Sequence, residues 1–273
     1  MIWNLIKDAA AWTAQNLPPS LSYQFVERLD HLLRGQDRTL LLGDVWFPFL
    51  ADESQKTMYY GLFEPEVAAA IHSLLPRGGC FFDVGANVGY FTAVAANVAG
   101  PSGRFFGFEP HPDHFARLAM LARLNESRYS MTCVEAAVLD HDGSVTLHES
   151  KHAGWHSICA ERIASEDFSQ NGNVPALTLD SFARDHSVER IDLLKIDVEG
   201  AEDRVLRGAK TLLKEKRIGA MVVELFHPGG GVMPALAGRI EELEFNVADA
   251  VTGRPLDASV TRMTSNVICT PRL

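Results

Sequence analysis

Short apolar runs alternate with segments of helical periodicity over most of the chain. The apolar runs lie at residues 80–84, 104–108, 131–138, 191–198, 218–225 and 266–270. The segments in which apolar residues recur every three or four positions lie at 64–75, 88–98, 112–125, 202–214 and 233–243. Strands that alternate with helices build a mostly parallel sheet covered by helices on both faces. The pattern therefore predicts an α/β fold of the Rossmann-like, doubly wound kind.

The alternation stops between residues 138 and 174. Asp142 and Gly143 lie between two apolar stretches, 136–139 and 145–148, and an Asp-Gly pair in this setting predicts a β-hairpin. The polar stretch that follows, residues 149–173, is too long for an ordinary connection, and such loops are often functional. We therefore expect a long functional loop here.

The first 60 residues lack a repeating pattern. Two helical stretches are expected, one ending at Pro18 and the other near Gly35, and an extended segment with Trp46 and Phe47 follows at 40–50. Packing against the core, or a lid, is the ordinary role of such aromatic residues. We predict an N-terminal extension of helices plus an extended segment over 1–60, and one Rossmann-like domain over 61–273.

The composition narrows the class of protein. With 273 residues, 47% of them hydrophobic, the chain is long enough to fold without disulfides or a structural metal. The net charge of −10 opposes binding to nucleic acid. No apolar run reaches the ~18 residues of a membrane span, and the four cysteines form no CxxC pair. We expect a cytoplasmic protein that does not bind nucleic acid and has no transmembrane segment.

The first predicted strand ends in an acid and leads into a glycine-containing turn. The stretch from Phe82 to Gly89 is FDVGANVG, and a helix is expected after it. In open α/β sheets ligands bind at the carboxyl ends of the strands. Gly85 permits a tight turn, and Gly89 permits a close approach between elements. This pattern predicts a cofactor site built around Asp83 and the residues of the turn.

The turn favours a cofactor without phosphate groups. Dinucleotide sites use G-x-G-x-x-G, but Asn87 stands where the second glycine belongs, and the Lys-Ser/Thr pair of a P-loop is missing. S-adenosylmethionine has no phosphate and carries positive charge, which Asp83 would attract. We therefore expect S-adenosylmethionine. A nicotinamide-dependent oxidoreductase and a catalytically silent cofactor-binding module remain as alternatives.

The next two predicted strands supply further contacts. Glu109 follows the second strand, 24 residues after Gly85, and an acid near this position commonly accepts hydrogen bonds from ribose hydroxyls. Pro110 comes next and leads toward the following helix. In the third strand, Glu135 and Ala136 are candidates for contact with adenine. The predicted cofactor-binding residues are Asp83, Gly85, Ala86, Asn87, Gly89, Glu109, Pro110, Glu135, Ala136 and Asp197.

Charged residues also end the fourth and fifth predicted strands. Strand alternation places Lys195, Asp197 and Glu199 on one face. Charges at the end of an apolar strand are costly unless they are paired or used, so a pair between Lys195 and a carboxylate is one alternative. Glu224 ends the fifth strand, and His227 follows it. Four strand-ending acids are therefore expected at one edge of the sheet: Asp83, Glu109, Asp197 and Glu224.

These segments resemble the FkbM family of S-adenosylmethionine-dependent methyltransferases. The matching stretches begin at Phe82 (FDVGANVG), Gly107 (GFEP), Leu177 (LTLD) and Leu194 (LKIDVEGAE), and together they cover about residues 78–227. The resemblance implies a sheet of seven strands with the last one antiparallel. It also implies that Asp83, Gly85 and Asn87 line the methionine part and that Glu109 holds the ribose. Characterised relatives look like O-methyltransferases, so the expected acceptor is a hydroxyl of a small molecule or glycan.

Methyl transfer to a hydroxyl requires removal of a proton, and Asp197 or His227 is the expected general base. Methyl transfer assisted by a divalent cation, held by oxygen and nitrogen ligands, is an alternative. The sequence contains no compact ligand spacing that would support it. The ligands of that cation would be Asp197, Glu199, Glu202, Glu224 and His227. His152 and His156 form a weaker metal pair, and we prefer an acceptor loop around Trp155 at that place. We therefore predict no metal. The sequence leaves open whether the protein forms a homo-oligomer.

Overall fold

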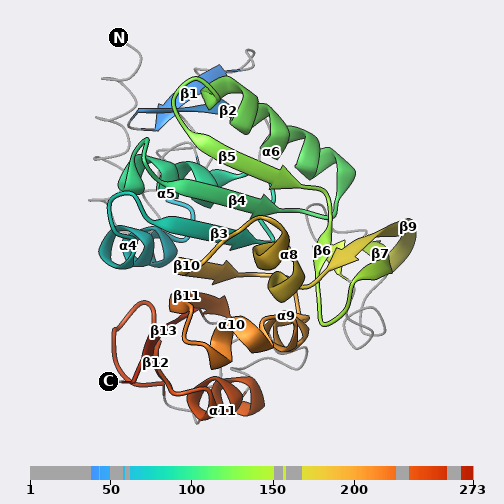
Figure 1. Ribbon diagram of the computed structural model, residues 1–273. Coiled ribbons are helices and arrows are strands. Elements are labelled where there is room, and N and C mark those ends of the chain that lie inside the picture. Colours follow the sequence, from blue (N-terminus) through green and yellow to red (C-terminus); the bar gives the residue numbers. More distant parts are fainter. Residues whose placement is uncertain are drawn as a thin grey trace, which may run out of the picture.

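The computed structural model describes residues 38–42, 44–49, 58, 62–150, 156–157, 168–225, 234–256 and 266–272. Its centre is a seven-stranded sheet (Figure 1). In their order across the sheet, the strands are β12 (Phe245–Asp249), β13 (Asn266–Pro271), β11 (Ile218–Glu224), β10 (Ile191–Ile196), β3 (Cys80–Val84), β4 (Arg104–Phe108) and β5 (Ser130–Val134). Only β13 is antiparallel to its neighbours in this sheet. The predicted doubly wound fold, with an antiparallel last strand, is confirmed.

The strand order creates a switch point beside β3. The chain enters the sheet at β3, adds β4 and β5 on one side, and then returns to place β10 on the other side. Val84 is in register with Phe108 and with Ile196. The residues that directly follow these three strand ends therefore meet at one edge. Ligands of doubly wound sheets bind at such a point.

Alternating side chains of the strands supply two cores. Phe81, Phe105 and Leu193 face one core, which also contains residues of α4 (Pro65–Leu74), α5 (Tyr90–Ala99) and α6 (Pro112–Asn125). Phe82, Phe106 and Leu194 face the other core. The helices of this second core are α8 (Leu179–Asp185), α9 (Glu202–Gly208), α10 (Lys210–Lys214) and α11 (Pro234–Glu242). Apolar residues at successive strand positions are thus explained by burial on both faces.

A hairpin from the predicted N-terminal extension packs on the first helix layer. It consists of β1 (Arg38–Leu42) and β2 (Val45–Phe49). Phe47 is buried, and its ring meets that of Tyr90 edge-on at 6.1 Å. The Asn125 amide donates to the Trp46 carbonyl oxygen at 2.7 Å and accepts its N–H at 2.8 Å. Core packing is confirmed for Phe47, whereas Trp46 is 48% exposed. The helices expected before residue 37 lie outside the described residues.

A second, four-stranded sheet replaces the predicted hairpin and part of the predicted long loop. Its strands, in order across the sheet, are β6 (Ala137–Val138), β9 (Phe168–Leu177), β7 (Gly143–Ser150) and β8 (His156–Ser157). The prediction of one strand over 131–138 was wrong, because the chain turns between β5 and β6. The hairpin prediction was also wrong in its partner, because β7 pairs with β9 and not with residues 136–139. Figure 1 shows this sheet beyond the edge at which the arrowheads of β4 and β5 point.

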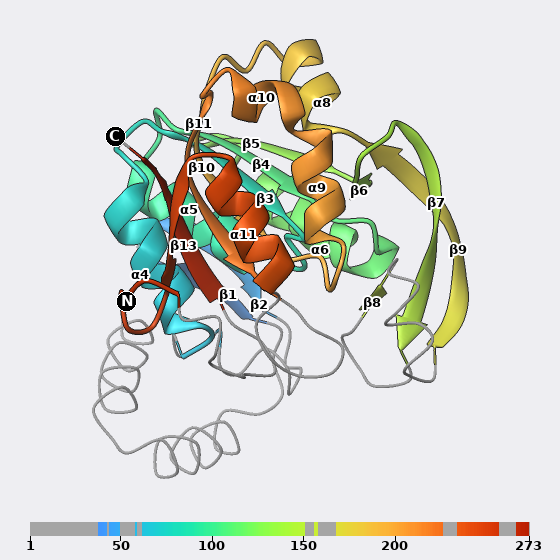
Figure 2. The ribbon, with the colours of Figure 1, turned by 90° about the horizontal axis from the view of Figure 1, so that it is seen from below.

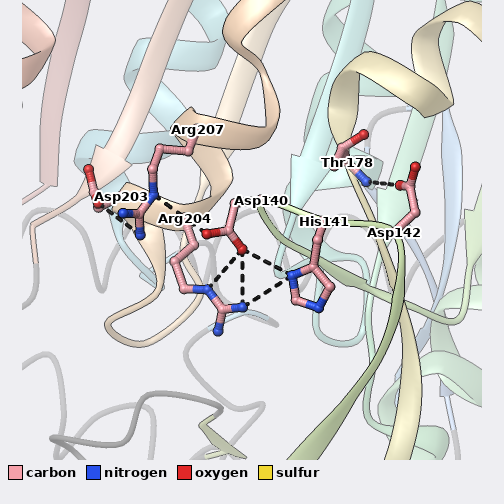
Figure 3. Close-up of polar contacts among 7 residues, drawn as sticks. All are labelled: Asp140, His141, Asp142, Thr178, Asp203, Arg204 and Arg207. Carbon is pink, nitrogen blue, oxygen red and sulfur yellow. Dashed lines mark hydrogen bonds and ion pairs between the residues drawn. The ribbon is translucent and has the colours of Figure 1, made fainter.

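Two aspartates join the base of the second sheet to α8 and α9 (Figure 3). Asp142 accepts hydrogen bonds from the Thr178 N–H at 2.7 Å and from the Ser181 hydroxyl at 2.8 Å. Asp140 accepts from Nε and Nη2 of Arg204, at 3.2 and 3.1 Å. A Cβ at Gly208 would overlap a backbone carbonyl beside Asp140, so α9 lies directly against the chain there. The second sheet therefore has a fixed base, and Figure 2 shows it extending outward beside α9.

The predicted helix over 202–214 is two helices with a break at Ala209. Asp180 stabilises the second one, since its carboxylate accepts the N–H groups of Thr211 at 2.7 Å and Leu212 at 3.0 Å. Unpaired N–H groups at a helix start favour an acidic partner. Strand β12 was not predicted. In the described part of the chain, no helix has the length and apolar character needed to cross a bilayer.

We expect Asp180→Ala to destabilise the fold, because it leaves the first N–H groups of α10 without their carboxylate. Loss of such a cap costs about 1 kcal/mol, which is a shift of about 2–4 °C in the melting temperature. Thermal unfolding followed by circular dichroism measures the shift. Asp185→Ala is the matched control, since the Asp185 side chain is 60% exposed and pairs with its exposed neighbour Arg184. Equal melting temperatures for the two variants would contradict the capping role.

Candidate functional site

The turn after β3, residues 85–89 and named here the β3 turn, folds through three residues with left-handed backbone. These are Gly85 (φ 78°), Asn87 (φ 51°) and Gly89 (φ 87°). The N–H groups of Gly85 and Ala86 both donate to the Phe108 carbonyl oxygen, at 3.0 and 2.9 Å. Because β3 and β4 are neighbours, these two bonds fix the turn against the end of β4. The β3 turn is therefore a preformed part of the sheet edge.

Neither glycine of the β3 turn has room for a side chain. A Cβ at Gly85 would overlap the backbone carbonyl oxygen of Asp197, at the end of β10. A Cβ at Gly89 would lie 2.7 Å from a methyl of Leu121 and 2.8 Å from one of Leu118, both on α6. Gly85 thus brings the turn against β10, and Gly89 brings it against α6. Glycine is required at both positions by contact as well as by backbone angle.

Asp83 lies beneath the β3 turn and has no exposed area. Its Oδ2 accepts a hydrogen bond from the Thr92 hydroxyl at 2.7 Å. Its Oδ1 has no hydrogen-bond partner and lies 3.5 Å from Nζ of Lys195. Burial raises the pKa of Asp83, and the Lys195 ammonium and the Thr92 hydroxyl oppose that rise. Asp83 therefore contacts Thr92 and Lys195, and its predicted part in cofactor binding remains a proposal.

The Lys195 ammonium links β10 to the β3 turn. Its Nζ lies 3.1 Å from Oδ2 of Asp197 and donates to the Gly85 carbonyl oxygen at 3.3 Å. The side chain is buried, and its Nζ lies 5.4 Å from the centre of the Phe91 ring. Burial lowers the pKa of Lys195, but the carboxylates around it outweigh burial and the net change is upward. The expected pair between Lys195 and a carboxylate is confirmed, and it involves two carboxylates.

Glu109 presents its carboxylate at the end of β4, held by two backbone groups. Oε2 accepts the Asn87 N–H at 2.8 Å, and Oε1 accepts the His111 N–H at 2.9 Å. Burial raises the pKa of Glu109 to about 7, while the two hydrogen bonds and the Lys195 ammonium hold it from rising further. Each carboxylate oxygen has a second lone pair for a further donor. This is the geometry needed to accept two neighbouring hydroxyl groups.

Two more carboxyl groups surround the Lys195–Asp197 pair. Burial, followed by the charges of Asp197 and Glu199, raises the pKa of Glu224 to about 10. Burial, followed by the charge of Asp197, raises the pKa of Glu64 to about 7. Sequence reasoning missed Glu64, because its position before Pro65 identifies it only as a helix start. In the structure its backbone is left-handed (φ 38°), and residues with such strained backbone often lie at functional sites.

The loop after β10 is shaped by a buried acid. The Glu202 Oε1 accepts the Gly200 N–H at 3.0 Å and the Val198 N–H at 3.3 Å. Glu199 and Gly200 both have left-handed backbone, with φ of 57° and 104°. Glu202 is fully buried, so it shapes the loop that begins with Asp197. β10 ends before Glu199, which has left-handed backbone. Glu199 therefore does not continue the strand alternation that was predicted to place it on one face with Asp197.

One comparison with known proteins decides the family. The model described as "Methyltransferase FkbM domain" matches residues 83–246, which include all of the strand-ending acids described above.

The chain belongs to the FkbM methyltransferase family.

It is an S-adenosylmethionine-dependent methyltransferase, as the resemblance implied. The FkbM domain begins at Asp83 and ends within β12 at Asn246. It therefore contains the whole edge formed by β3, β4, β10 and β11, together with the second sheet. The hairpin β1–β2 and helix α4 precede it.

Three curated proteins show what this FkbM chain is similar to. Methyltransferase sdnD of Sordaria araneosa is 27% identical, with 63% of this chain and 76% of that protein covered. The 2-O-methyltransferase NoeI of Sinorhizobium fredii is 28% identical, with coverages of 58% and 70%. The hexuronic acid methyltransferase AglP of Haloferax volcanii is 27% identical, with coverages of 54% and 56%. A solved structure, methyltransferase FkbM of Methylobacillus flagellatus, is 15% identical with a TM-score of 0.47 and covers 81% of this chain and 56% of that one.

The residues of the FkbM site fit S-adenosylmethionine. Gly85 allows the β3 turn to lie close against the backbone of Asp197, and Glu109 offers two acceptor oxygens. Oδ1 of the buried Asp83 carboxylate accepts no hydrogen bond among the described residues and lies 3.5 Å from the Lys195 ammonium; its negative charge favours a cationic ligand nearby. A dinucleotide would instead need donors for its phosphates. The nicotinamide alternative therefore finds no support here.

The predicted site residues are distributed as follows. Of the predicted cofactor-binding residues, those partly exposed at the sheet edge are Gly85, Asn87, Pro110 and Asp197. The buried ones are Asp83, Ala86, Gly89, Glu109 and Ala136, and Glu135 is exposed. The Ala136 N–H donates to the Val134 carbonyl oxygen at 3.0 Å, in the turn after β5. His227 and His152 lie outside the described residues. Among the described ones, no three His, Cys, Asp or Glu side chains are grouped to hold a metal ion.

We expect the affinity for S-adenosylmethionine to depend on the ionisation of Glu109. The ribose hydroxyls donate to the charged form, and the pKa of about 7 means that this form is lost as the pH falls. Affinity should therefore drop about tenfold from pH 8 to pH 6 and level off at higher pH. Calorimetric titration across this range measures it. Glu109→Gln should bind weakly and without this dependence, whereas the exposed control Glu126→Gln should keep it. A full pH dependence in Glu109→Gln would assign the effect to another group.

Proposed function

We propose that this enzyme transfers the methyl group of S-adenosylmethionine to a hydroxyl group of a sugar or secondary metabolite. The names of two relatives support a sugar-like acceptor, since NoeI is a 2-O-methyltransferase and AglP is a hexuronic acid methyltransferase. The observation that carries the proposal is the position of Asp197. Asp197 is partly exposed at the edge of the sheet, its backbone carbonyl lies against Gly85 of the β3 turn, and its carboxylate is bonded to Lys195.

S-adenosylmethionine, when bound, supplies a methyl carbon already activated by its sulfonium group. The residues of this chain then have to place the acceptor oxygen in line with that carbon. We propose that Glu109 holds the ribose and that the β3 turn lies against the methionine part. The Asp83 carboxylate below the turn favours the cationic end. Glu135 and Ala136, after β5, remain the candidates for the adenine side.

We propose that Asp197 is the general base. As the acceptor oxygen forms its bond to the methyl carbon, the bond from that carbon to sulfur breaks, and the hydroxyl proton passes to the Asp197 carboxylate. Lys195 donates to Oδ2 of Asp197, and we propose that the hydroxyl proton passes to the other oxygen, Oδ1. Burial and the charges of Asp197 and Glu199 raise the pKa of Glu224, which favours the uncharged form of this group beside the base. His227 remains the second candidate for this role.

A cytoplasmic location completes the proposal. Cys80, Cys133 and Cys269 are free thiols in this structure, and free cysteines are usual in a reducing compartment. The net charge of −10 argues against a nucleic acid as the acceptor.

Incubation with S-adenosylmethionine labelled in its methyl group tests the proposal. The acceptors offered are neutral sugars, hexuronic acids and hydroxylated secondary metabolites, each paired with its amine or deoxy analogue. We expect label in an ether-linked methyl group on a hydroxyl oxygen and none in the deoxy analogues. Label only on nitrogen, or tight binding of S-adenosylmethionine with no transfer to any acceptor, would overturn the proposal. The latter result would favour the catalytically silent module.

A further inference from the structure

A single buried ammonium group connects the cofactor side of the site with the proposed base. Lys195 is 3% exposed, yet its Nζ reaches Oδ2 of Asp197 and the carbonyl oxygen of Gly85. Asp197 follows β10, and Gly85 follows β3, which is the neighbouring strand. One side chain therefore contacts both the proposed base and the β3 turn.

Neutralising Asp83 does not explain this arrangement on its own. Nζ lies 3.5 Å from the Asp83 carboxylate but only 3.1 Å from that of Asp197. Asp83 is fully buried and already accepts a hydrogen bond from Thr92, whereas the Asp197 side chain is 28% exposed and accepts a hydrogen bond from Lys195. The bond to the Gly85 carbonyl oxygen also contributes nothing to the charge balance of Asp83. The geometry thus favours a function at Asp197.

We infer that Lys195 is a positioning residue for methyl transfer, whose ammonium fixes the Asp197 carboxylate against the β3 turn. This inference rests on the proposed function, in which Asp197 accepts the hydroxyl proton. Lys195 itself touches neither the acceptor nor the methyl group. Its contribution is to keep the base in one orientation relative to the bound cofactor, where a displacement of about 1 Å lowers the rate about 100-fold.

A double-mutant cycle between Lys195 and Asp197 tests the inference. The variants are Lys195→Met, Asp197→Asn and the double variant, with Lys210→Met as an exposed-lysine control. The rate constant kcat is measured at saturating S-adenosylmethionine, together with KM for the acceptor. We expect Lys195→Met to lower kcat about 100-fold with KM changed by less than about threefold. In the Asp197→Asn background, Lys195→Met should cost nothing further, because its effect passes through Asp197.

Folding must be separated from positioning, since Lys195→Met leaves the buried Asp83 without its cation. The variant Lys195→Met/Asp83→Asn replaces both charges by neutral groups and should recover the melting temperature. We expect its kcat at saturating cofactor to stay low, whereas a merely structural lysine would regain kcat together with stability. The kcat and the melting temperature of Asp83→Asn alone are the reference values.

The outcomes separate the inference from the function on which it rests. If the wild-type protein methylates no hydroxyl compound, the proposed function fails before any variant is compared. If the wild type is active but the losses from Lys195→Met and Asp197→Asn multiply in the double variant, Lys195 does not act through Asp197. Normal kcat in Lys195→Met or in Asp197→Asn would overturn the inference directly.

Discussion

Replacing Asp197 by asparagine is expected to lower kcat about 1000-fold while leaving the affinity for S-adenosylmethionine nearly unchanged. Asparagine keeps the shape of the side chain and removes the acceptor for the hydroxyl proton, and such a loss typically costs about 100- to 10,000-fold. Stopped-time assays with labelled cofactor measure kcat, and calorimetry measures the affinity.

Asp185→Asn, on the exposed end of α8, is the matched control and should retain full kcat. His227→Ala is compared in the same assay. If His227→Ala loses the rate and Asp197→Asn keeps it within about threefold, the base is His227. Loss of cofactor affinity in Asp197→Asn, with kcat retained, would instead make Asp197 a residue of the cofactor site alone.

Replacing Gly85 by alanine is expected to abolish measurable binding of S-adenosylmethionine. The new Cβ would overlap the Asp197 carbonyl oxygen, and the left-handed backbone at φ 78° costs about 1–2 kcal/mol for a residue with a side chain. The β3 turn has to move away from β10 to relieve the overlap. That movement displaces the turn from the Glu109 carboxylate, to which Asn87 is bonded.

Gly238→Ala is the control for this variant. Gly238 lies in α11, nothing stands within 4 Å of a Cβ built there, and alanine in a helix stabilises by about 0.5–1 kcal/mol. Melting temperature and calorimetry are measured for both variants. A Gly85→Ala protein that melts and binds S-adenosylmethionine like the wild type would show that the turn does not need its close contact with β10.

The central sheet was predictable because its strands are buried on both faces. Continuous apolar runs gave β3 and β4 their observed bounds, and Pro112 at the first turn set the start of α6. The convergence of Gly85, Glu109 and Asp197 followed from parallel strands alone. Those features depend on local pattern and on a simple rule of topology.

The second sheet was not predictable from local pattern. Among the residues of β7 and β9 whose side chains are described, Leu147, Val174 and Ala176 are buried on one face, and the polar residues between them resemble a loop. Their pairing also joins residues that are far apart in the chain, and β7 passes through a register shift after Leu147. Sequence pattern does not encode which strand becomes the partner.

The electrostatics of the site needed the structure as well. The sequence left open whether Lys195 was paired, and it gave no sign that Asp83 would lie fully buried beneath the turn. Glu64 could not be identified as a site residue from the sequence, because its closeness to Lys195 and Asp197 depends on how α4 packs against the sheet. Charge interactions are set by three-dimensional distance and burial, which the order of residues does not state.

We propose that strand-ending carboxylates and the β3 turn hold a positively charged nucleoside that has no phosphate. Isothermal titration of the unmodified, folded protein tests it most directly. We expect saturable one-site heat with S-adenosylmethionine at about pH 8, and none with a nicotinamide dinucleotide at the same concentration. A folded protein that gives no heat with S-adenosylmethionine, or that binds the dinucleotide instead, would show that the site does not hold such a nucleoside.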